Sequence, residues 1–392
     1  MAPNEDRPAA PEWQLARLIE GYLTTQLLYV AAKLGVPDLL AQGPRSGTEL
    51  AAAAGVHEAS FVRVLRGLVL HGVLAEEDDG RFALTELGTL LRSDVPRSLR
   101  ATAIGRGEMY YEPAAALLRA LREGGTPFEL VLGEPFFDHL ARHPEHEAIF
   151  QGSMAGRSER EADDVVAAYD FTPFGRLVDV GGGQGILLSA ILRSAPALQG
   201  VLLDLPAAIE DARARLGQDG HDGRFECVAG DFFVEVPTGA DAYLLSRIIH
   251  DWEDEDARRI LTMCRRATGD DGTLLLVEAI LPDRVHDAPG AVQMDLLMFM
   301  FLGARERTAA EYEQLLAESG FRLTRIAPTR SPAGLSVIEA RAVPGRAAPR
   351  SSIDDTFRHD QGGIRCRPPR RDAHSTPAST FPRTRGARSS SS

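Results

Sequence analysis

The stretch that most constrains the fold of this chain is Leu177–Gly185, with the sequence Leu-Val-Asp-Val-Gly-Gly-Gly-Gln-Gly. A short run of buried-strand character ends there in a glycine-rich turn, and an apolar, helix-compatible segment follows. A second apolar run ends at Asp204, nineteen positions after Gly185. This order predicts the first βαβ unit of a nucleotide-binding crevice, where glycines admit the ligand and a distal acid binds ribose hydroxyls. A glycine-rich turn without a ligand is the alternative.

The glycine spacing excludes two common classes of nucleotide ligand. A dinucleotide fingerprint needs G-x-G-x-x-G, but the sixth positions counted from Gly181 and Gly183 are Ile186 and Leu188. A P-loop needs G-x-x-x-x-G-K-[ST], which does not occur, and Lys33 is the only lysine of the chain. The remaining G-x-G-x-G pattern resembles the first motif of S-adenosylmethionine (SAM)-dependent methyltransferases.

Strand and helix patterns alternate regularly over 169–343, which predicts an α/β domain. We expect a Rossmann-like, doubly wound and mostly parallel sheet that a closing antiparallel pair at 321–326 and 335–340 completes. Ligands of such a sheet bind at the carboxyl ends of its strands. The five strands before the closing pair are expected at 176–180, 200–203, 224–228, 242–246 and 273–278.

Residues 13–105 have the pattern of a winged helix. One long amphipathic helix is expected over 13–34, two shorter helices at 49–54 and 58–71, and a hairpin at 73–85. A winged helix can bind DNA, but four consecutive acids form the wing tip, and 13–100 holds nine basic and ten acidic residues. We therefore predict a dimerisation domain, because the apolar stripe of the first helix is wide enough to cover a partner.

The remaining segments have separate expected roles. Residues 106–168 are expected to form a helical linker that supplies part of the substrate pocket. The polar N-terminus, 1–12, and the tail, 344–392, lack apolar periodicity and are expected to be disordered, since they cannot bury enough apolar surface to offset their ordering entropy.

Charge and composition exclude several functions. The net charge is −13; the tail contributes +6, so the rest of the chain carries −19. An acidic body argues against nucleic acid as a partner. The three cysteines have no metal-ligand spacing, and no run of eighteen apolar residues occurs. We expect a cytoplasmic protein without a membrane segment, a signal peptide, a disulfide or a metal cofactor.

Four polar side chains are expected at strand ends that face one crevice. Asp204 suits the ribose of a nucleoside, and Asp231 suits the adenine amino group, with the ring of Phe232 stacked near the base. A simple turn residue is the alternative for Asp231. His250 follows the fourth strand of the sheet and Glu278 ends the fifth.

His250 is the candidate general base. A histidine with a free pKa near 6.5 can accept the proton of a phenol, whose pKa near 10 makes it a poor nucleophile at neutral pH. A carboxylate on the far ring nitrogen has to fix the tautomer, and Glu278 and Glu306 are both candidates for this role. The alternative for His250 is a surface histidine at a helix N-terminus.

Phe150 and Met154 lie at helical spacing, and Arg157 follows one turn later. Such a face is a candidate pocket wall for a flat apolar ligand, because methionine is flexible and polarisable; plain core packing is the alternative. Arg157 could reach an anionic group or be a solvated helix charge.

Taken together, these motifs resemble those of the caffeate-type O-methyltransferases of plants and their bacterial relatives, which act on aromatic polyketides and other phenolic metabolites. The resemblance covers about 13–343. The matching segments are Leu177–Gly185, Gly230–Phe232, His250–Trp252, Leu276–Pro282 and Arg305–Thr308.

The resemblance implies a role for each candidate residue. His250 would be the base, held by Glu278 and Glu306. Phe150, Met154 and Met298 would clamp the aromatic acceptor. The winged helix would form an intertwined homodimer. Plant members carry lysine at the position of Ser246, so the chain follows the bacterial pattern there, and the tail has no counterpart. The expected cofactor contacts are Arg157, Gly181, Asp204, Asp231, Phe232 and Ser246.

The sequence therefore predicts a homodimeric SAM-dependent O-methyltransferase that methylates a phenolic hydroxyl of a small aromatic natural product. One alternative is an enzyme of the same scaffold that binds SAM without transferring its methyl group, such as a hydroxylase or decarboxylase. The other is a winged-helix DNA-binding regulator, although 58–71 offers only Arg63, Arg66 and His71 as basic residues.

Overall fold

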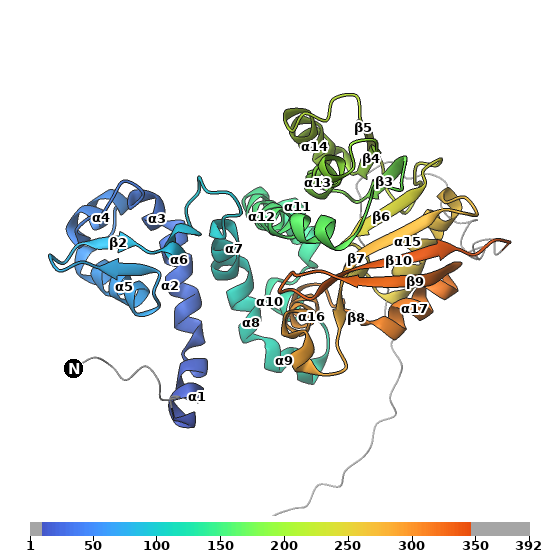
Figure 1. Ribbon diagram of the computed structural model, residues 1–392. Coiled ribbons are helices and arrows are strands. Elements are labelled where there is room, and N and C mark those ends of the chain that lie inside the picture. The colour runs from blue at the N-terminus through green and yellow to red at the C-terminus, as the bar shows by residue number, and fades with distance from the viewer. Residues whose placement is uncertain (1–9, 346–392) are drawn as a thin grey trace, which may run out of the picture. The chain divides into compact units, whose positions relative to one another are not determined.

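A computed structural model describes residues 10–345 of the chain. The tail from 346 and the first nine residues, which include most of both segments expected to be disordered, lie outside the described residues. The centre of the fold is an eight-stranded sheet with the order β5-β4-β3-β6-β7-β10-β9, in which β8 pairs with β7 (Figure 1). Its strands are β3 (Arg176–Val180), β4 (Gln199–Asp204), β5 (Phe225–Ala229), β6 (Ala242–Ser246), β7 (Thr273–Leu281), β8 (Arg307–Thr308), β9 (Phe321–Pro328) and β10 (Leu335–Ala342).

The sheet is doubly wound, as the sequence predicts. Strands β3 to β7 pair in parallel, and β10 runs antiparallel to both β7 and β9. The chain lays β4 and β5 on one side of β3 and then returns to lay β6 and β7 on its other side. The carboxyl ends of β3 and β6 therefore flank the topological switch point, where ligands of such sheets bind.

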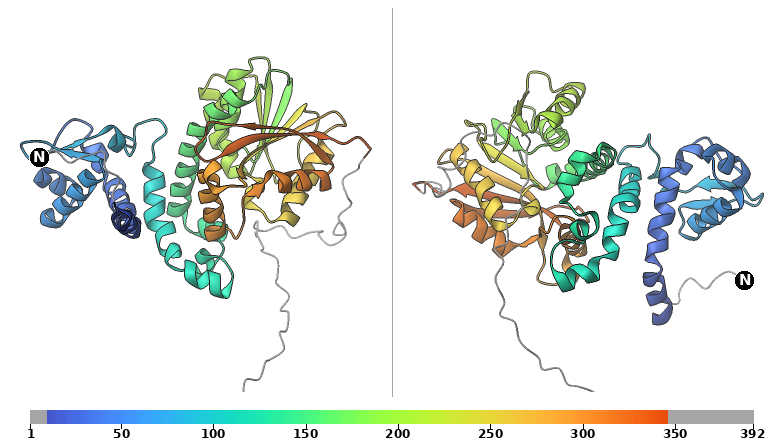
Figure 2. Two further views of the ribbon diagram at one scale, coloured as in Figure 1. Left: turned by 60° about the horizontal axis from the view of Figure 1, so that its bottom comes forward. Right: turned by 180° about the vertical axis from the view of Figure 1, so that it is seen from behind.

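Helices cover both faces of the sheet (Figure 2). Leu177, Leu202 and Leu244 point to one face, whereas Val178 and Leu245 point to the other, because successive side chains of a strand alternate. The first face packs against α12 (Pro144–Ala168), α13 (Ile186–Ser194) and α14 (Pro206–Gln218), and the second against α15 (Asp254–Ala267) and α17 (Ala309–Glu318).

A group of short helices packs together with α12 and α16 around a separate apolar core. Its core holds Met109, Phe128, Phe136, Leu140 and Phe301, with aromatic rings in mutual contact. The elements are α7 (Arg100–Gly105), the π-helix η1 (Arg106–Tyr110), α8 (Tyr111–Ala115), α9 (Leu117–Glu123), α10 (Pro127–Leu132), α11 (Phe136–Arg142), η3 (Val285–Asp287) and α16 (Pro289–Phe301).

The N-terminal part contains the two short helices and the hairpin that the sequence predicts. Its first helix is broken, contrary to expectation: Glu20 leaves helical geometry with ψ near 3°, and Gly21, which disfavours a helix interior, begins the second piece. The elements are α1 (Pro11–Ile19), α2 (Gly21–Lys33), α3 (Val36–Leu39), α4 (Gly47–Ala54), α5 (Glu58–Leu70), β1 (Leu74–Glu76), β2 (Phe82–Leu84) and α6 (Glu86–Thr89).

The start of α4 also differs from the expectation. The helix begins two residues earlier than predicted, because Ser46 and Glu49 form a capping box: the Ser46 hydroxyl accepts from the Glu49 N–H, and the Glu49 carboxylate accepts from the Ser46 N–H.

Large apolar side chains remain exposed along α1 and the beginning of α2. Trp13 is 70% exposed and Leu18 is 78% exposed, and α1 buries none of its residues. Leu15, Ile19, Tyr22 and Leu23 continue the same apolar stripe. Exposed apolar side chains that follow one another along a helix are typical of an interaction site.

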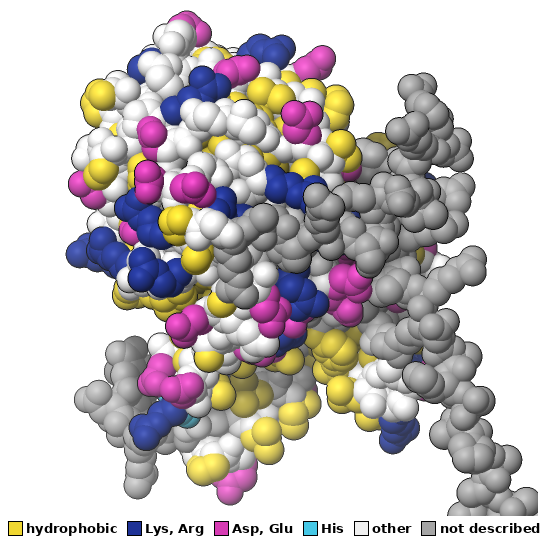
Figure 3. Space-filling model, turned by 90° about the vertical axis from the view of Figure 1, so that its right-hand side faces the viewer, with side chains coloured by type: hydrophobic (Ala, Val, Ile, Leu, Met, Phe, Trp, Pro, Cys, Tyr) yellow, Lys and Arg dark blue, Asp and Glu magenta, His cyan; other side chains and the backbone are white. Residues whose placement is uncertain are grey.

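Figure 3 shows where charged side chains lie on one face of the molecule. Acidic and basic side chains both lie on this face, and several basic ones gather at the left edge of the view. No helix within 10–345 combines the length and the apolar character that crossing a membrane requires.

Candidate active site

The glycine-rich turn lies between β3 and α13, at the switch point of the sheet. Gly181, Gly183 and Gly185 all have positive φ, between 55° and 73°, which disfavours any side chain there. Gly182 has ordinary φ but no space: a Cβ atom would lie 2.6 Å from Oδ2 of Asp179. The turn therefore needs glycine for its backbone geometry and for close packing.

Asp204 lies beside this turn at the end of β4, as the sequence predicts. Its Oδ2 accepts from the N–H of Gly183 at 2.7 Å, and its Oδ1 accepts from the N–H of Leu205 at 2.6 Å. Burial raises the pKa of this carboxyl above its ordinary value. The two backbone bonds fix its orientation and leave lone pairs free to accept from ligand hydroxyls.

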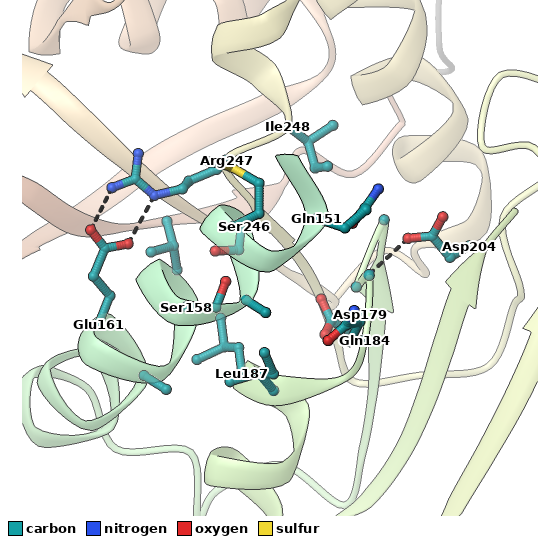
Figure 4. Close-up of a pocket in the computed structure, with 18 of the residues that line it drawn as sticks. Gln151, Ser158, Glu161, Asp179, Gln184, Leu187, Asp204, Ser246, Arg247 and Ile248 are labelled. Atoms are coloured by element: carbon teal, nitrogen blue, oxygen red, sulfur yellow. Dashed lines mark hydrogen bonds and ion pairs between the residues drawn. The ribbon is translucent and has the colours of Figure 1, made fainter. Parts of the chain in front are cut away.

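A cavity of about 320 Å³ lies between α12 and the carboxyl ends of β3, β4 and β6 (Figure 4). Five of the residues that the sequence assigns to ligand binding line it together: Gly181, Asp204, Ser246, Phe150 and Met154. The strand ends thus bring the cofactor candidates against the candidate acceptor wall on α12. The size of the cavity is at the lower end of the usual range for small-molecule sites.

Two charged groups that line the cavity have buried atoms without a partner. Among the described residues, both carboxylate oxygens of Asp179 and the Nη1 atom of Arg247 have no hydrogen-bond partner. Burial and the charge of Asp204 raise the pKa of Asp179 to about 7. The other guanidinium nitrogens of Arg247 pair with both carboxylate oxygens of Glu161, at 2.9 Å and 2.7 Å.

His250 lies next to the cavity in the 3₁₀ helix η2 (Ile249–Asp251), directly after β6. Its Nδ1 atom is 2.7 Å from Oε1 of Glu306 and 3.8 Å from Oε2 of Glu278. Its Nε2 atom is 3.3 Å from Oδ1 of Asp251, which lines the cavity. His250 is 4% exposed, and both glutamates are fully buried.

The two glutamates hold His250 in different ways. Glu306 contacts the ring directly, and its position is fixed because its N–H donates to Asp295. Glu278 was expected at the end of its strand, which is wrong: β7 continues to Leu281. Oε1 of Glu278 accepts instead from the N–H groups of Ile248 and Ile249, at 3.1 Å and 2.8 Å. Glu278 thus fixes the backbone that carries His250.

The surrounding charges decide the protonation of His250. Burial alone would lower the pKa of His250, but the carboxylates of Glu278, Asp251 and Glu306 outweigh it and raise this pKa to about 9. Burial raises the pKa of Glu278 to about 7. The imidazolium form of His250 is therefore favoured at neutral pH in the ligand-free protein.

Other expected ligand-binding residues lie outside the set that lines this cavity. Arg157 contacts the Sδ atom of Met294 at 3.6 Å, and burial lowers the pKa of Arg157 to about 10. Asp231 accepts from the N–H of Phe233 at 2.8 Å, as a turn residue does. A Cβ built on Gly181 would lie 3.6 Å from Phe232, so that ring is close to the turn. Met298 lies on α16, partly buried.

Sequence reasoning assigned no role to Asp251 or Arg247. Asp251 directly follows the candidate base, so its position in the chain was an available signal. The sequence signal for Arg247 was weaker. Its backbone φ of 56° and its ion pair with Glu161, eighty-six positions away in the chain, are visible only in three dimensions.

A doubly wound sheet with this glycine-rich turn, a distal aspartate and a carboxylate-held histidine beside the cavity defines a SAM-dependent methyltransferase. The sequence of this chain matches two protein families: the O-methyltransferase domain over residues 111–322 and the O-methyltransferase dimerisation domain over residues 16–94. The chain belongs to this O-methyltransferase family, which confirms the predicted fold, family and enzyme class.

Relatives of known activity cover nearly the whole described chain. Phenazine O-methyltransferase PhzM of Lysobacter antibioticus is 46% identical over 329 residues, 84% of this chain and 96% of the relative. The crystal structure of LaPhzM superposes with a TM-score of 0.81 at 45% identity, covering 86% of this chain and 100% of that one.

A third similar structure contains both the cofactor SAM and an aromatic ligand. It is the O-methyltransferase NcsB1 from neocarzinostatin biosynthesis, in complex with SAM and 2-hydroxy-5-methyl naphthoic acid. Its TM-score is 0.69 at 35% identity, and the match covers 82% of this chain and 96% of that one.

Proposed function

We propose that this enzyme transfers the methyl group of SAM to a phenolic hydroxyl of a small aromatic natural product, with His250 as the general base. The observation that carries the proposal is the buried Glu306–His250 contact beside a cavity that has an aromatic wall. The names of the relatives support the class of acceptor, since they act on or bind fused aromatic rings.

The unpartnered atoms of the cavity fit the amino-acid end of SAM. That end carries one carboxylate and one ammonium group. Arg247 offers an unused N–H for the carboxylate, and Asp179 offers an unused carboxylate for the ammonium. Asp204 would accept from the ribose hydroxyls. Charged hydrogen bonds of this kind are roughly twice as strong as neutral ones.

The aromatic acceptor would lie against α12 and α11. Phe137, Phe150 and Met154 line the cavity there, and the ring of Phe136 supports Phe150 at a centroid distance of 5.3 Å. Aromatic and methionine side chains give a flat acceptor a large contact area. Met298 is proposed as the opposite clamp from α16.

The proton of the acceptor moves to Nε2 of His250. SAM supplies an electrophilic methyl group on a sulfonium sulfur; the oxygen–carbon bond forms as the carbon–sulfur bond breaks. His250 has to be neutral to accept the proton. The positive charge of the SAM sulfonium lowers the pKa of His250 and so favours its neutral form. Glu306 then stabilises the imidazolium, while Glu278 keeps its backbone in place.

The assembly we propose is a homodimer through the N-terminal domain. The dimerisation-domain match covers most of the exposed apolar stripe on α1 and α2. A second copy would bury that stripe. The DNA-binding alternative has less support, since the wing tip is acidic and its Arg81 pairs with Glu77 and Asp79. We expect the enzyme to bind neither nucleic acid nor membrane and to act in the cytoplasm.

The test uses His250→Ala with a methyl-labelled cofactor and a panel of hydroxylated phenazines and naphthoic acids. We expect methyl transfer to fall on the order of 10²–10⁴-fold, because general-base catalysis contributes that much. Affinity for S-adenosylhomocysteine should be unchanged. His286→Ala, which changes an exposed histidine, is the matched control.

Unchanged turnover in His250→Ala would contradict the base assignment. Product formation without transfer of the label in the wild type would instead favour a non-methylating enzyme of this scaffold, such as a hydroxylase or decarboxylase.

A further inference from the structure

Three histidines cluster at the junction of α11 and α12, outside the proposed catalytic group. His139 lies in the last turn of α11, His143 lies between the helices, and His146 lies in the first turn of α12. One ligand-capable atom from each lies within 4.8 Å of the others. The cysteines of the chain have no metal-ligand spacing, whereas the junction of the two helices brings these three histidines together.

The hydrogen bonds of His139 set its ring for metal binding. Nδ1 of His139 is 2.7 Å from Oε1 of Glu134, so this nitrogen carries the proton that it donates to the carboxylate. Nε2 of His139 is 2.8 Å from Nδ1 of His146. Two ring nitrogens at this distance share one proton, so at least one offers a free lone pair. A metal-binding histidine has this arrangement, with its far N–H on a carboxylate.

Burial changes across the cluster in a way that gives an ion access. His139 is 5% exposed, whereas the side chain of His143 is 42% exposed. The rings of His139 and His143 stack at a centroid distance of 4.1 Å and an angle of 24°. The cluster thus runs from a buried histidine to a partly exposed one, so an ion can reach it from solvent.

We propose that His139, His143 and His146 bind a divalent transition-metal ion such as Zn²⁺, with Glu134 orienting His139. Three imidazole nitrogens and a water complete the tetrahedral set that Zn²⁺ prefers. Binding replaces the proton shared by His139 and His146 with the metal: the two rings turn so that both lone pairs face the ion, and the displaced proton moves to Nε2 of His146. Glu134 also pairs with Arg142, which holds the carboxylate in place.

The ion would tie the two helices that form the proposed acceptor wall. Phe136 of α11 contacts Phe150 of α12 at 5.3 Å between ring centroids, and His139 contacts Phe128 at 5.5 Å. Fixing His139 to His146 fixes the spacing of these rings. The site is therefore positional and takes no part in proton transfer.

The experiment measures zinc bound to the tag-free, full-length protein, by elemental analysis and by competition with a chromophoric chelator. We expect one tightly held Zn²⁺ per wild-type chain and loss of that ion in His143→Gln and His146→Gln. Both changed positions are partly exposed, so the variants should keep their affinity for S-adenosylhomocysteine. His286→Gln is the matched control and should retain the ion. Zn²⁺ should raise the Tm of the wild type and of this control, but not of His146→Gln.

Glu134→Gln tests the orienting carboxylate without removing a ligand. Affinity for Zn²⁺ should fall roughly 10–100-fold, as for other supporting carboxylates. Co²⁺ in place of Zn²⁺ should give the visible absorption bands of a tetrahedral site in the wild type. Equal zinc content in wild type and His146→Gln, or no zinc in either, would overturn the proposal. Because His250→Ala keeps the cluster, it should bind zinc normally whatever its activity.

Discussion

Three carboxylates surround His250, and each holds it in a different way. Glu306 contacts Nδ1, Asp251 lies 3.3 Å from Nε2, and Glu278 accepts from the backbone beside the ring. The carboxylate at Nε2 matters for catalysis, because this nitrogen is the one proposed to accept the proton. Asp251 stabilises the imidazolium and thereby delays deprotonation of the base as the pH rises.

The pH dependence of the reaction tests this arrangement. A base must be deprotonated, so kcat/KM for the acceptor should rise with pH through the pKa of His250 in the SAM complex, which lies below the value of about 9 that the carboxylates give it without SAM. Asp251→Asn removes one charge that raises this pKa, so the rising limb should move to lower pH. Asp270→Asn, at an exposed position, should leave the limb in place. A limb at the wild-type position in both variants would contradict the role of Asp251.

Arg247 should affect the cofactor rather than the acceptor. Arg247→Lys can still pair with Glu161 but loses the unpartnered Nη1 donor proposed for the SAM carboxylate. A charged hydrogen bond contributes about 1.5–3 kcal/mol, so affinity for S-adenosylhomocysteine in calorimetry should fall about tenfold or more. Arg258→Lys, in an exposed pair with Glu318, is the control. Equal affinities would assign Arg247 to the Glu161 pair alone.

The turn after β3 acts at the scale of elements, because it joins a strand, a helix and the cavity. Gly182→Ala would place a Cβ 2.6 Å from Asp179 and 2.9 Å from Leu202. We expect loss of SAM binding with a lowered Tm, since strand and turn have to move apart. At Gly269 an added Cβ would meet no atom of residues 10–345 within 4 Å, so Gly269→Ala should keep both properties. Unchanged SAM affinity and Tm in Gly182→Ala would show that the turn can accommodate a Cβ atom there, which would contradict the prediction.

The elements also show what the sequence could predict. Strands β3 and β6 begin and end where the alternating and buried patterns predict, because hydrophobic runs mark them directly. Glu278 was expected at the end of its strand; it lies inside β7, where two backbone N–H groups donate to its carboxylate. Its unexpected position depends on η2, which packs against β7 only in the folded chain.

The break at Glu20 was missed for a related physical reason. Apolar residues continue at helical spacing on both sides of it, so periodicity alone gives one helix. The candidate site was likewise only partly predictable. Residues at strand ends could be placed from the sequence, whereas the ion pair of Arg247 with Glu161 could not.

For the whole molecule, the exposed stripe on α1 predicts dependence on a second copy. Leu18→Glu puts a charge on a side chain that is 78% exposed in one chain but would be buried in the proposed dimer. Light scattering should show a monomer for this variant and a dimer for the wild type. Val234→Glu, at a position 72% exposed in the SAM-binding domain, should remain dimeric. A dimeric Leu18→Glu protein would place the interface elsewhere.

Within the part of the chain that the structure describes, α1 buries none of its residues, so apolar packing does little to hold it in helical form. An isolated nine-residue helix is only marginally stable in water, so an unassembled chain should unwind there first. Arg17 would then become a tryptic cleavage site, cut quickly in dilute protein and slowly at concentrations where two chains associate. Proteolysis at one arginine would thus report how much of the enzyme is assembled.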